Sequence, residues 1–182
     1  MGYHSHSACI LVAVTVVIGT TFCANVNSTL INSFLATGNL SNGLCNYSIA
    51  EYACSSAVNI NESRLADLLN CIANNSVNVT KEALKLFFTN VSGILNGALS
   101  AYANETTTPS PSKALILDVL GELRVNSFSS ENLTNVDLIK QLFLTRFKPF
   151  LASASVDFLS CLSTKNFSCE TYQAVYVHTL FA

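Results

Sequence analysis

Apolar residues are spaced most regularly between Thr80 and Tyr102, where their pattern predicts one continuous α-helix. They recur at steps of three and four residues, the spacing that places side chains on one face of a helix. These apolar positions are Leu84, Phe87, Phe88, Val91, Leu95, Ala98, Leu99 and Tyr102. The opposite, polar stripe consists of Lys85, Thr89, Ser92, Asn96 and Ser100. Gly93 and Gly97 weaken the helix, but their spacing is expected to let a neighbouring helix approach closely.

Shorter helices are predicted on both sides of this one. Ser48 and Glu51 match a capping box, which starts a helix over residues 49–57. Pro111-Ser112, Ser155 and Ser168 are expected to cap three more helices. The periodic stretches place the other helices at residues 30–35, 63–74, 113–124, 136–147, 156–163 and 169–180. No stretch alternates apolar and polar residues for long enough to predict a strand, so the sequence indicates an all-α fold.

A Thr/Ser/Pro loop at residues 103–112 divides the helical pattern into an N-terminal half, residues 24–102, and a C-terminal half, residues 113–182. Residues 65–87 and 155–177 share the same order of helix, cysteine, Asn/Ser-rich loop and helix. This likeness predicts stacked helical hairpins in a short superhelical array of the armadillo type, with disulfide-clasped corners. Two unrelated hairpins would give the same pattern. The last residues end inside an apolar periodic stretch, so we expect the C-terminal half to be truncated.

Residues 1–23 have the features of a secretory signal peptide. The apolar run from Ala8 to Ile18 has the length of the hydrophobic segment of such a peptide and is too short to span a bilayer. Small residues at Thr21 and Cys23 favour cleavage after Cys23, with Ala24 as a competing site. We therefore expect the chain to enter the secretory pathway.

Asparagine usage indicates the same compartment. The acceptor motif for N-glycosylation is Asn-x-Ser/Thr, here called a sequon. The chain has ten sequons, whereas its 19 asparagines and 37 serines and threonines would produce about four by chance. They begin at Asn27, Asn39, Asn46, Asn61, Asn74, Asn78, Asn90, Asn104, Asn132 and Asn166. This excess predicts an N-glycosylated protein.

The composition fits that prediction. Hydrophobic residues make up 50% of the chain and charged residues only 11%, well below the quarter that is usual in soluble domains. Attached glycans would supply the solubility that so few charges do not. The net charge of −2 gives no basic surface for nucleic acid or for an anionic membrane.

Five of the seven cysteines lie beyond the expected signal peptide, and in an oxidising compartment they are candidates for disulfides. Cys161 closes one predicted helix and Cys169 opens the next. A connection of seven residues lets these two helix ends approach within bonding distance. We therefore expect a Cys161–Cys169 disulfide.

The three other cysteines leave one thiol over. An antiparallel hairpin of residues 49–57 and 63–73 would bring Cys45 beside Cys71 and leave Cys54 unpaired. An intermolecular bridge, an inert buried thiol or a partner in sequence outside this chain would each explain Cys54. We favour the last of these.

No arrangement of residues predicts catalysis, a metal or a cofactor. Zinc sites use cysteines and histidines at short spacing, whereas these cysteines are far apart and His178 is the only histidine after the signal peptide. No nucleophile elbow, P-loop or dinucleotide motif is present in the sequence. Lys140, Arg146 and Lys148 lie within nine residues, which is typical of a solvated face, with a docking patch as the alternative.

Two stretches, GLCNYSIAEYACSS at 43–56 and FLASASVDFLSCLSTKNFSCETYQAV at 150–175, carry a resemblance. They are similar to segments of large vertebrate secreted or surface glycoproteins in the style of the mesothelin, stereocilin and otoancorin family. Members combine a signal peptide, many sequons and helical units that are proposed to stack as a superhelix. The resemblance implies adhesion or attachment to extracellular matrix and implies no catalytic residues. Family members often continue to a GPI anchor, which the final residues of this sequence do not predict.

The sequence therefore predicts a secreted or cell-surface N-glycoprotein that is not an enzyme and works as an adhesion or interaction module. Its expected partner is an extracellular protein or matrix ligand, with no nucleic acid and no transmembrane span in the mature chain. The alternative is a saposin-like protein that binds lipid or membrane, because the predicted helices are amphipathic. Saposin-like domains join their first and last helices through cysteines, a pattern that the local Cys161–Cys169 spacing does not match.

Overall fold

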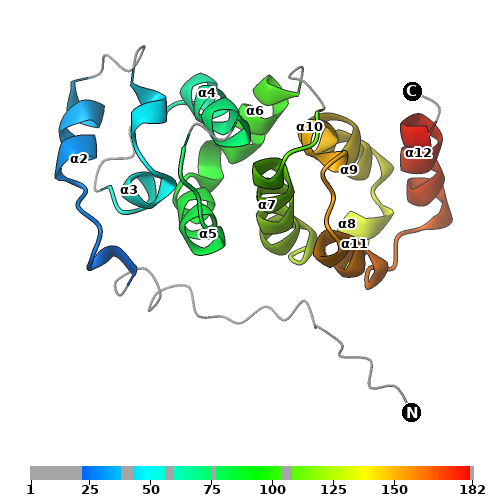
Figure 1. Cartoon of the computed structure of the whole chain (residues 1–182). Helices are drawn as coiled ribbons and strands as arrows, with labels where there is room; N and C mark the ends of the chain where they lie inside the picture. The colour runs from blue at the N-terminus through cyan, green and yellow to red at the C-terminus, as the bar shows by residue number, and fades with distance from the viewer. Residues whose placement is uncertain (1–21, 38–42, 56–59, 75–76, 104–107, 181–182) are drawn as a thin grey trace.

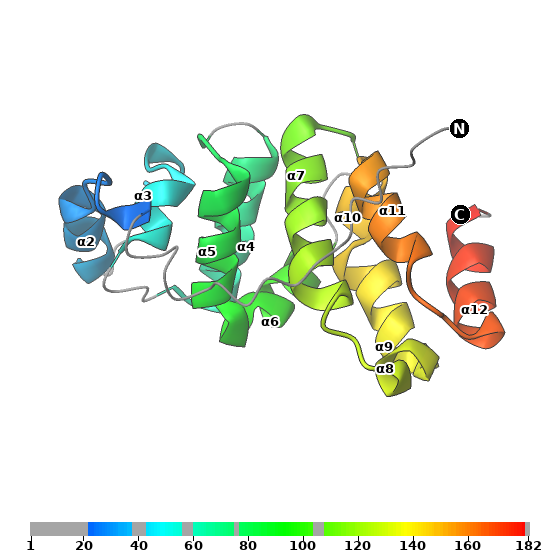
Figure 2. The ribbon, with the colours of Figure 1, turned by 90° about the horizontal axis from the view of Figure 1, so that it is seen from below.

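The computed structural model describes residues 22–37, 43–55, 60–74, 77–103 and 108–180. These residues form helices joined by loops and contain no strand, so the predicted all-α fold is confirmed. Figures 1 and 2 show the helices side by side along one long direction, in roughly the order of the chain, from α2 at one end to α12 at the other.

The described part holds eleven α-helices, one short 3-10 helix (η1) and two π-helical turns (η2 and η3). In chain order they are α2 (Thr29–Ala36), η1 (Leu44–Asn46), α3 (Ile49–Ala53), α4 (Glu62–Ala73), α5 (Lys81–Asn90), α6 (Ser92–Tyr102), α7 (Pro111–Leu120), η2 (Gly121–Val125), α8 (Ser130–Thr134), α9 (Val136–Gln141), η3 (Leu142–Arg146), α10 (Lys148–Leu151), α11 (Val156–Ser163) and α12 (Cys169–Leu180).

One hydrophobic core runs through both halves of the chain. Its buried side chains extend from Ile31 in α2 to Phe158 in α11 as a single contact cluster. α4 packs chiefly against α6 and α3 against α5, while α4 and α5 both contact α7. Across the loop at 103–112, Tyr102 of α6 stacks on Phe150 of α10 with ring centroids 5.3 Å apart. The loop therefore joins two parts of one core; the expected superhelical array stays a prediction.

Local polar residues start several helices as the sequence predicts. The Ser48 hydroxyl accepts the Glu51 N–H at 3.3 Å, and the Glu51 carboxylate accepts the Ser48 N–H at 2.8 Å, which completes the capping box. Ser155 accepts the Phe158 N–H at 3.0 Å in the same way. These caps satisfy N–H groups that have no partner inside the helix.

The cap of α7 differs from the expected one. Ser110, and not Ser112, accepts the Lys113 N–H, at 3.2 Å, and the helix begins at Pro111. Proline suits the first helical position because its missing N–H would have no partner there. The Ser110 hydroxyl also donates to the Ala73 carbonyl at 3.1 Å, so the start of α7 is tied to the end of α4.

The long helix predicted over Thr80–Tyr102 is wrong in one respect, because it breaks at Val91 into α5 and α6. Ser92 and Gly93, which follow the break, are poor helix formers. The two pieces also pack on different partners, α5 on α3 and α6 on α4. One straight helix would not reach both partners. Gly97 does face a neighbour, since a Cβ there would overlap the Glu62 carboxylate of α4, whereas nothing lies within 4 Å of a Cβ at Gly93.

Two predicted helices end in a wide π turn. In η2 the Asn126 N–H donates to the Gly121 carbonyl at 3.2 Å, and in η3 the Phe147 N–H donates to the Leu142 carbonyl at 2.8 Å. Each bond spans five residues instead of four, as a π turn requires. A Cβ at Gly121 would lie 2.8 Å from the ring of buried Phe158, so the glycine lets α11 pack against η2.

Replacing Gly121 by alanine is therefore expected to lower the free energy of unfolding. The backbone φ of −58° tolerates any residue, so the effect comes from crowding against Phe158. Overpacking of this kind costs about 1–3 kcal/mol, reduced by the better helix propensity of alanine. Gly93→Ala is the matched control, because its Cβ meets open space and should stabilise the helix by up to about 1 kcal/mol. Urea denaturation of the two variants should give shifts of opposite sign; a shift of the same sign would contradict this packing.

Candidate functional site

The sequon asparagines lie at the surface wherever the structure describes them. Asn39 and Asn104 fall outside the described residues. Seven of the other eight side chains are exposed, and Asn132 is half-buried. The exposed ones are Asn27, Asn46, Asn61, Asn74, Asn78, Asn90 and Asn166. All eight positions lie in loops, in short helical turns or at helix ends, where a glycan displaces no core side chain.

Several of these asparagines also support the fold. Asn61 caps α4, because its Oδ1 accepts the Arg64 N–H at 3.0 Å. Asn132 completes the capping box of α8 through its Oδ1, which accepts the Ser129 N–H at 3.1 Å. These cap bonds use the amide oxygen and not the nitrogen, to which a glycan is attached. The amide nitrogen of Asn90 instead donates to the Ala53 carbonyl at 2.9 Å.

Cys45 and Cys71 form a disulfide, as the sequence favoured, with Cα atoms 5.4 Å apart. The expected reason is wrong, however, because α3 packs chiefly against α5 and does not form the predicted hairpin with α4. Instead η1, which carries Cys45, contacts α4 beside Cys71. α3 ends at Ala53, before the predicted end at residue 57, and its Tyr52 hydroxyl holds η1 by donating to the Leu44 carbonyl at 2.8 Å.

Cys54 has a partner inside the chain, contrary to the expectation that it would be left over. It is bonded to Cys23, with Cα atoms 5.4 Å apart. This pair was not predicted because Cys23 lies in the expected signal peptide, residues 1–23. Cleavage after Cys23 and the Cys23–Cys54 bond exclude each other.

Cys161 and Cys169 are not joined in a disulfide, so that prediction is wrong. Cys161 is buried, and its thiol donates to the Asn126 Oδ1 at 3.0 Å, whereas Cys169 is exposed. The helices that carry them go to different partners: α11 packs against η2 and α7, and α12 against α8, α9 and η3. Ser168 accepts the Thr171 N–H at 3.1 Å near the start of α12, in agreement with the predicted cap.

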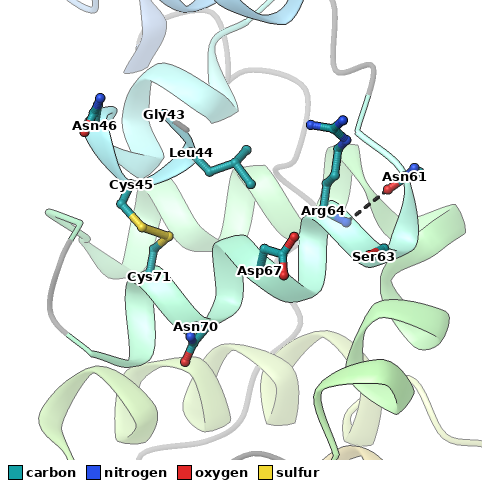
Figure 3. A pocket seen from close by; sticks show the side chains of 10 residues that line it. All are labelled: Gly43, Leu44, Cys45, Asn46, Asn61, Ser63, Arg64, Asp67, Asn70 and Cys71. Carbon is teal, nitrogen blue, oxygen red and sulfur yellow. Dashed lines mark hydrogen bonds between the residues drawn. A yellow bond between two sulfur atoms is a disulfide. The ribbon is translucent and has the colours of Figure 1, made fainter. Parts of the chain in front are cut away.

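A groove of about 680 Å³ with a mixed polar and apolar lining lies between η1 and α4 (Figure 3). Its lining residues are Gly43, Leu44, Cys45, Asn46, Asn61, Ser63, Arg64, Asp67, Asn70 and Cys71. Arg64 and Asp67 project from α4 on the side that faces η1. Two of the lining residues, Asn46 and Asn61, are sequon asparagines, so glycans attached there would stand at the rim of the groove.

A cluster of ion pairs links α5 to η2. Glu122 binds both Lys81 and Lys85, the latter at 3.0 Å. Burial raises the pKa of Glu122, but the hydrogen bonds from the two lysines outweigh burial and hold the pKa below its ordinary value. The same pairing raises the pKa of Lys81.

Glu122→Gln is expected to destabilise the protein by about 0.5–1 kcal/mol at neutral pH, a modest effect because the lysines are 39% and 46% exposed. A carboxyl with a lowered pKa contributes stability above its ordinary pKa of 4.5 and loses it as the pH falls through the folded-state pKa. The difference between variant and parent should therefore shrink steadily in urea titrations below pH 4.5. Asp67→Asn, which removes an exposed carboxylate of α4 outside these ion pairs, is the control and should leave the free energy of unfolding nearly unchanged at neutral pH.

The basic residues for which the sequence predicts a solvated face or a docking patch lie on three successive elements. Lys140 is half-exposed in α9, Lys148 is exposed in α10, and Arg146 is half-buried at the end of η3. Arg146 turns to α6, where its Nε donates to the Ser100 hydroxyl at 3.5 Å. The charge of Arg124 in η2 acts on Arg146. Arg124 was not among the basic residues named from the sequence.

No three side chains from His, Cys, Asp and Glu converge on a metal site within the described ranges. The His178 side chain lies outside the described part. None of the helices in the described part is both long and apolar enough to cross a bilayer.

Comparisons with known protein families, with curated proteins and with solved structures find no match to this chain.

Proposed function

We propose that this chain is a secreted or cell-surface N-glycoprotein that acts without catalysis, as an adhesion or interaction module for an extracellular protein or matrix ligand. The observation that carries the proposal is the placement of the sequons. Every sequon asparagine in the described part is exposed or half-exposed, although half of the residues in the chain are hydrophobic. All eight therefore offer attachment points at which a glycan displaces no core side chain.

The disulfides add to this support. Two cysteine pairs at bonding geometry suit an oxidising compartment. Keeping Cys23 requires signal cleavage upstream of it. Gly19-Thr20-Thr21 has small residues at the two positions that signal peptidase reads, so we place the cleavage site after Thr21. The adhesion role follows the resemblance to the mesothelin, stereocilin and otoancorin style of glycoprotein.

The groove beside α4 supports the saposin-like alternative less well than it supports an interaction module. A lipid-binding chamber is lined mainly by apolar side chains, whereas this groove places Arg64, Asp67 and three asparagines beside Leu44 and the Cys45–Cys71 disulfide. Neither disulfide joins the first described helix to the last.

Mass spectrometry of the protein secreted from animal cells tests the proposal. We expect a mass that falls on treatment with an N-glycosidase, an N-terminus at Phe22, and two fewer disulfides after reduction. Retention of the chain inside the cell, or a secreted chain without glycans, would contradict it. Binding of the glycoprotein to immobilised matrix, but not to liposomes at neutral or acidic pH, would then favour interaction over lipid binding; uptake of lipid would favour the alternative.

A further inference from the structure

Two arginines from different π turns lie against the same face of α6. Arg124, near the end of η2, donates from Nη2 to the Ser92 carbonyl at 3.2 Å. Arg146, at the end of η3, donates from Nε to the Ser100 hydroxyl at 3.5 Å. Exposed Asn96 stands between the two serines, since positions four apart share one side of a helix. The two guanidinium groups thus border one polar strip.

Neither arginine forms an ion pair within the described part of the chain. The ion pairs of the described residues join Lys81 and Lys85 to Glu122. Burial lowers the pKa of Arg146, and the charge of Arg124 lowers it further. Arg124 also has a buried Nε with no hydrogen-bond partner. Two like charges that are partly shielded from water repel each other and destabilise the folded state. Energetically unfavourable arrangements of this kind are found mostly at functional sites.

The backbone that carries both arginines is unusual as well. Each arginine lies within a π turn that continues an α-helix, η2 after α7 and η3 after α9. π turns are rare, and they occur frequently where a protein binds a ligand or reacts. Here they place Arg124 and Arg146 beside α6 from two separate segments.

We propose that Arg124, Arg146 and the Asn96 side chain form a binding site for a sulfate-type oxyanion on the surface of α6. A guanidinium group presents paired N–H donors that match the oxygen atoms of such an ion, and the Asn96 amide supplies another donor. The ion would neutralise the two like charges. Its source is either free inorganic sulfate or a sulfate ester on an extracellular polysaccharide; the polysaccharide rests on the proposed function, whereas the site itself does not.

Calorimetric titration of the purified full-length chain with sodium sulfate, against sodium chloride at equal ionic strength, tests the site. The parent should bind sulfate, and Arg124→Gln or Arg146→Gln should weaken binding at least tenfold. Arg64→Gln is the matched control, because it makes the same change on α4 in the other half of the chain. Sulfate also stabilises proteins generally by exclusion from their surface, an effect common to all four proteins. Equal binding by all four would overturn the proposal.

Thermal unfolding in chloride provides a second readout. Arg146→Gln should unfold at the same temperature as the parent or a higher one, because it removes the repulsion from Arg124. A lower unfolding temperature together with unchanged sulfate binding would show a purely structural role and overturn the proposal. If the glutamine variant does not fold, Arg146→Lys keeps the charge but not the paired donors, and its sulfate binding should be weaker than that of the parent.

Heparin and fully desulfated heparin distinguish the two sources. Binding of heparin alone, weakened by the same two substitutions, supports a polysaccharide sulfate. Binding of inorganic sulfate without binding of heparin supports the site and overturns the polysaccharide as its source. Both arms use purified protein, so they stay informative even if the glycosidase experiment contradicts secretion.

Discussion

Replacing Cys45 and Cys71 together by alanine is expected to lower the free energy of unfolding by about 3.5 kcal/mol. The disulfide closes a loop with a sequence separation of 26 residues, and the entropy that such a loop removes from the unfolded chain gives this magnitude. Alanine avoids a new hydroxyl at Cys71, which is only 7% exposed. Guanidinium denaturation of the non-reduced protein measures the change.

Cys169→Ala is the control for this prediction, because Cys169 is exposed and outside both disulfides, and it should leave stability nearly unchanged. The pair Cys23→Ala and Cys54→Ala should cost a similar amount, about 3.7 kcal/mol for a separation of 31 residues. That double variant also reports on processing. Under the proposed function, a chain secreted after cleavage at Cys23 would lack the Cys23–Cys54 disulfide, and replacing Cys23 would then have no effect on it.

Phe150→Ala is expected to cost about 3–5 kcal/mol, the range for truncating a fully buried phenylalanine. Its ring stacks on Tyr102 at an interplanar angle of 12°, and this contact joins α10 to α6 across the loop at 103–112. Because one core contains both rings, the whole protein should unfold in a single transition at lower denaturant concentration. Circular dichroism and tyrosine fluorescence should follow the same curve.

Phe128→Ala, a half-buried phenylalanine at the edge of the core, is the control and should cost clearly less. Two separated transitions in Phe150→Ala, with only one of them shifted, would contradict a single core. They would show instead that the N-terminal and C-terminal halves unfold independently.

Local sequence was enough to predict the parts of the fold that depend on nearby residues. The capping box of Ser48 and Glu51 closes within four residues, and the cap at Ser155 does the same. The break at Val91 was not predictable from periodicity, because the apolar spacing continues across it and only the different partners of α5 and α6 reveal it. The π turns were missed for a similar reason, since each adds one residue to a turn without changing its composition.

The candidate sites show the same division. Sequons are read directly from the sequence. Their exposure was also predictable, because Asn, Ser and Thr are common at helix ends, which lie at the surface. Disulfide pairing depends on which helices pack together. Cys45 is bonded to Cys71 because η1 packs against α4. Cys161 is not bonded to Cys169 because α11 packs against η2 and α12 against α9. Arg124 and Arg146 are 22 positions apart in sequence, and no local motif connects them.

The packing order of the helices also bears on how the chain can be made. α3 meets α5, α4 meets α6, and α5 meets α7, so most contacts form between segments that leave the ribosome within a few tens of residues of each other. Contacts that are close in sequence form quickly and need little loop closure. The amino-terminal helices can therefore assemble while α11 and α12 are still being synthesised, so folding can begin at one end of the chain and proceed to the other.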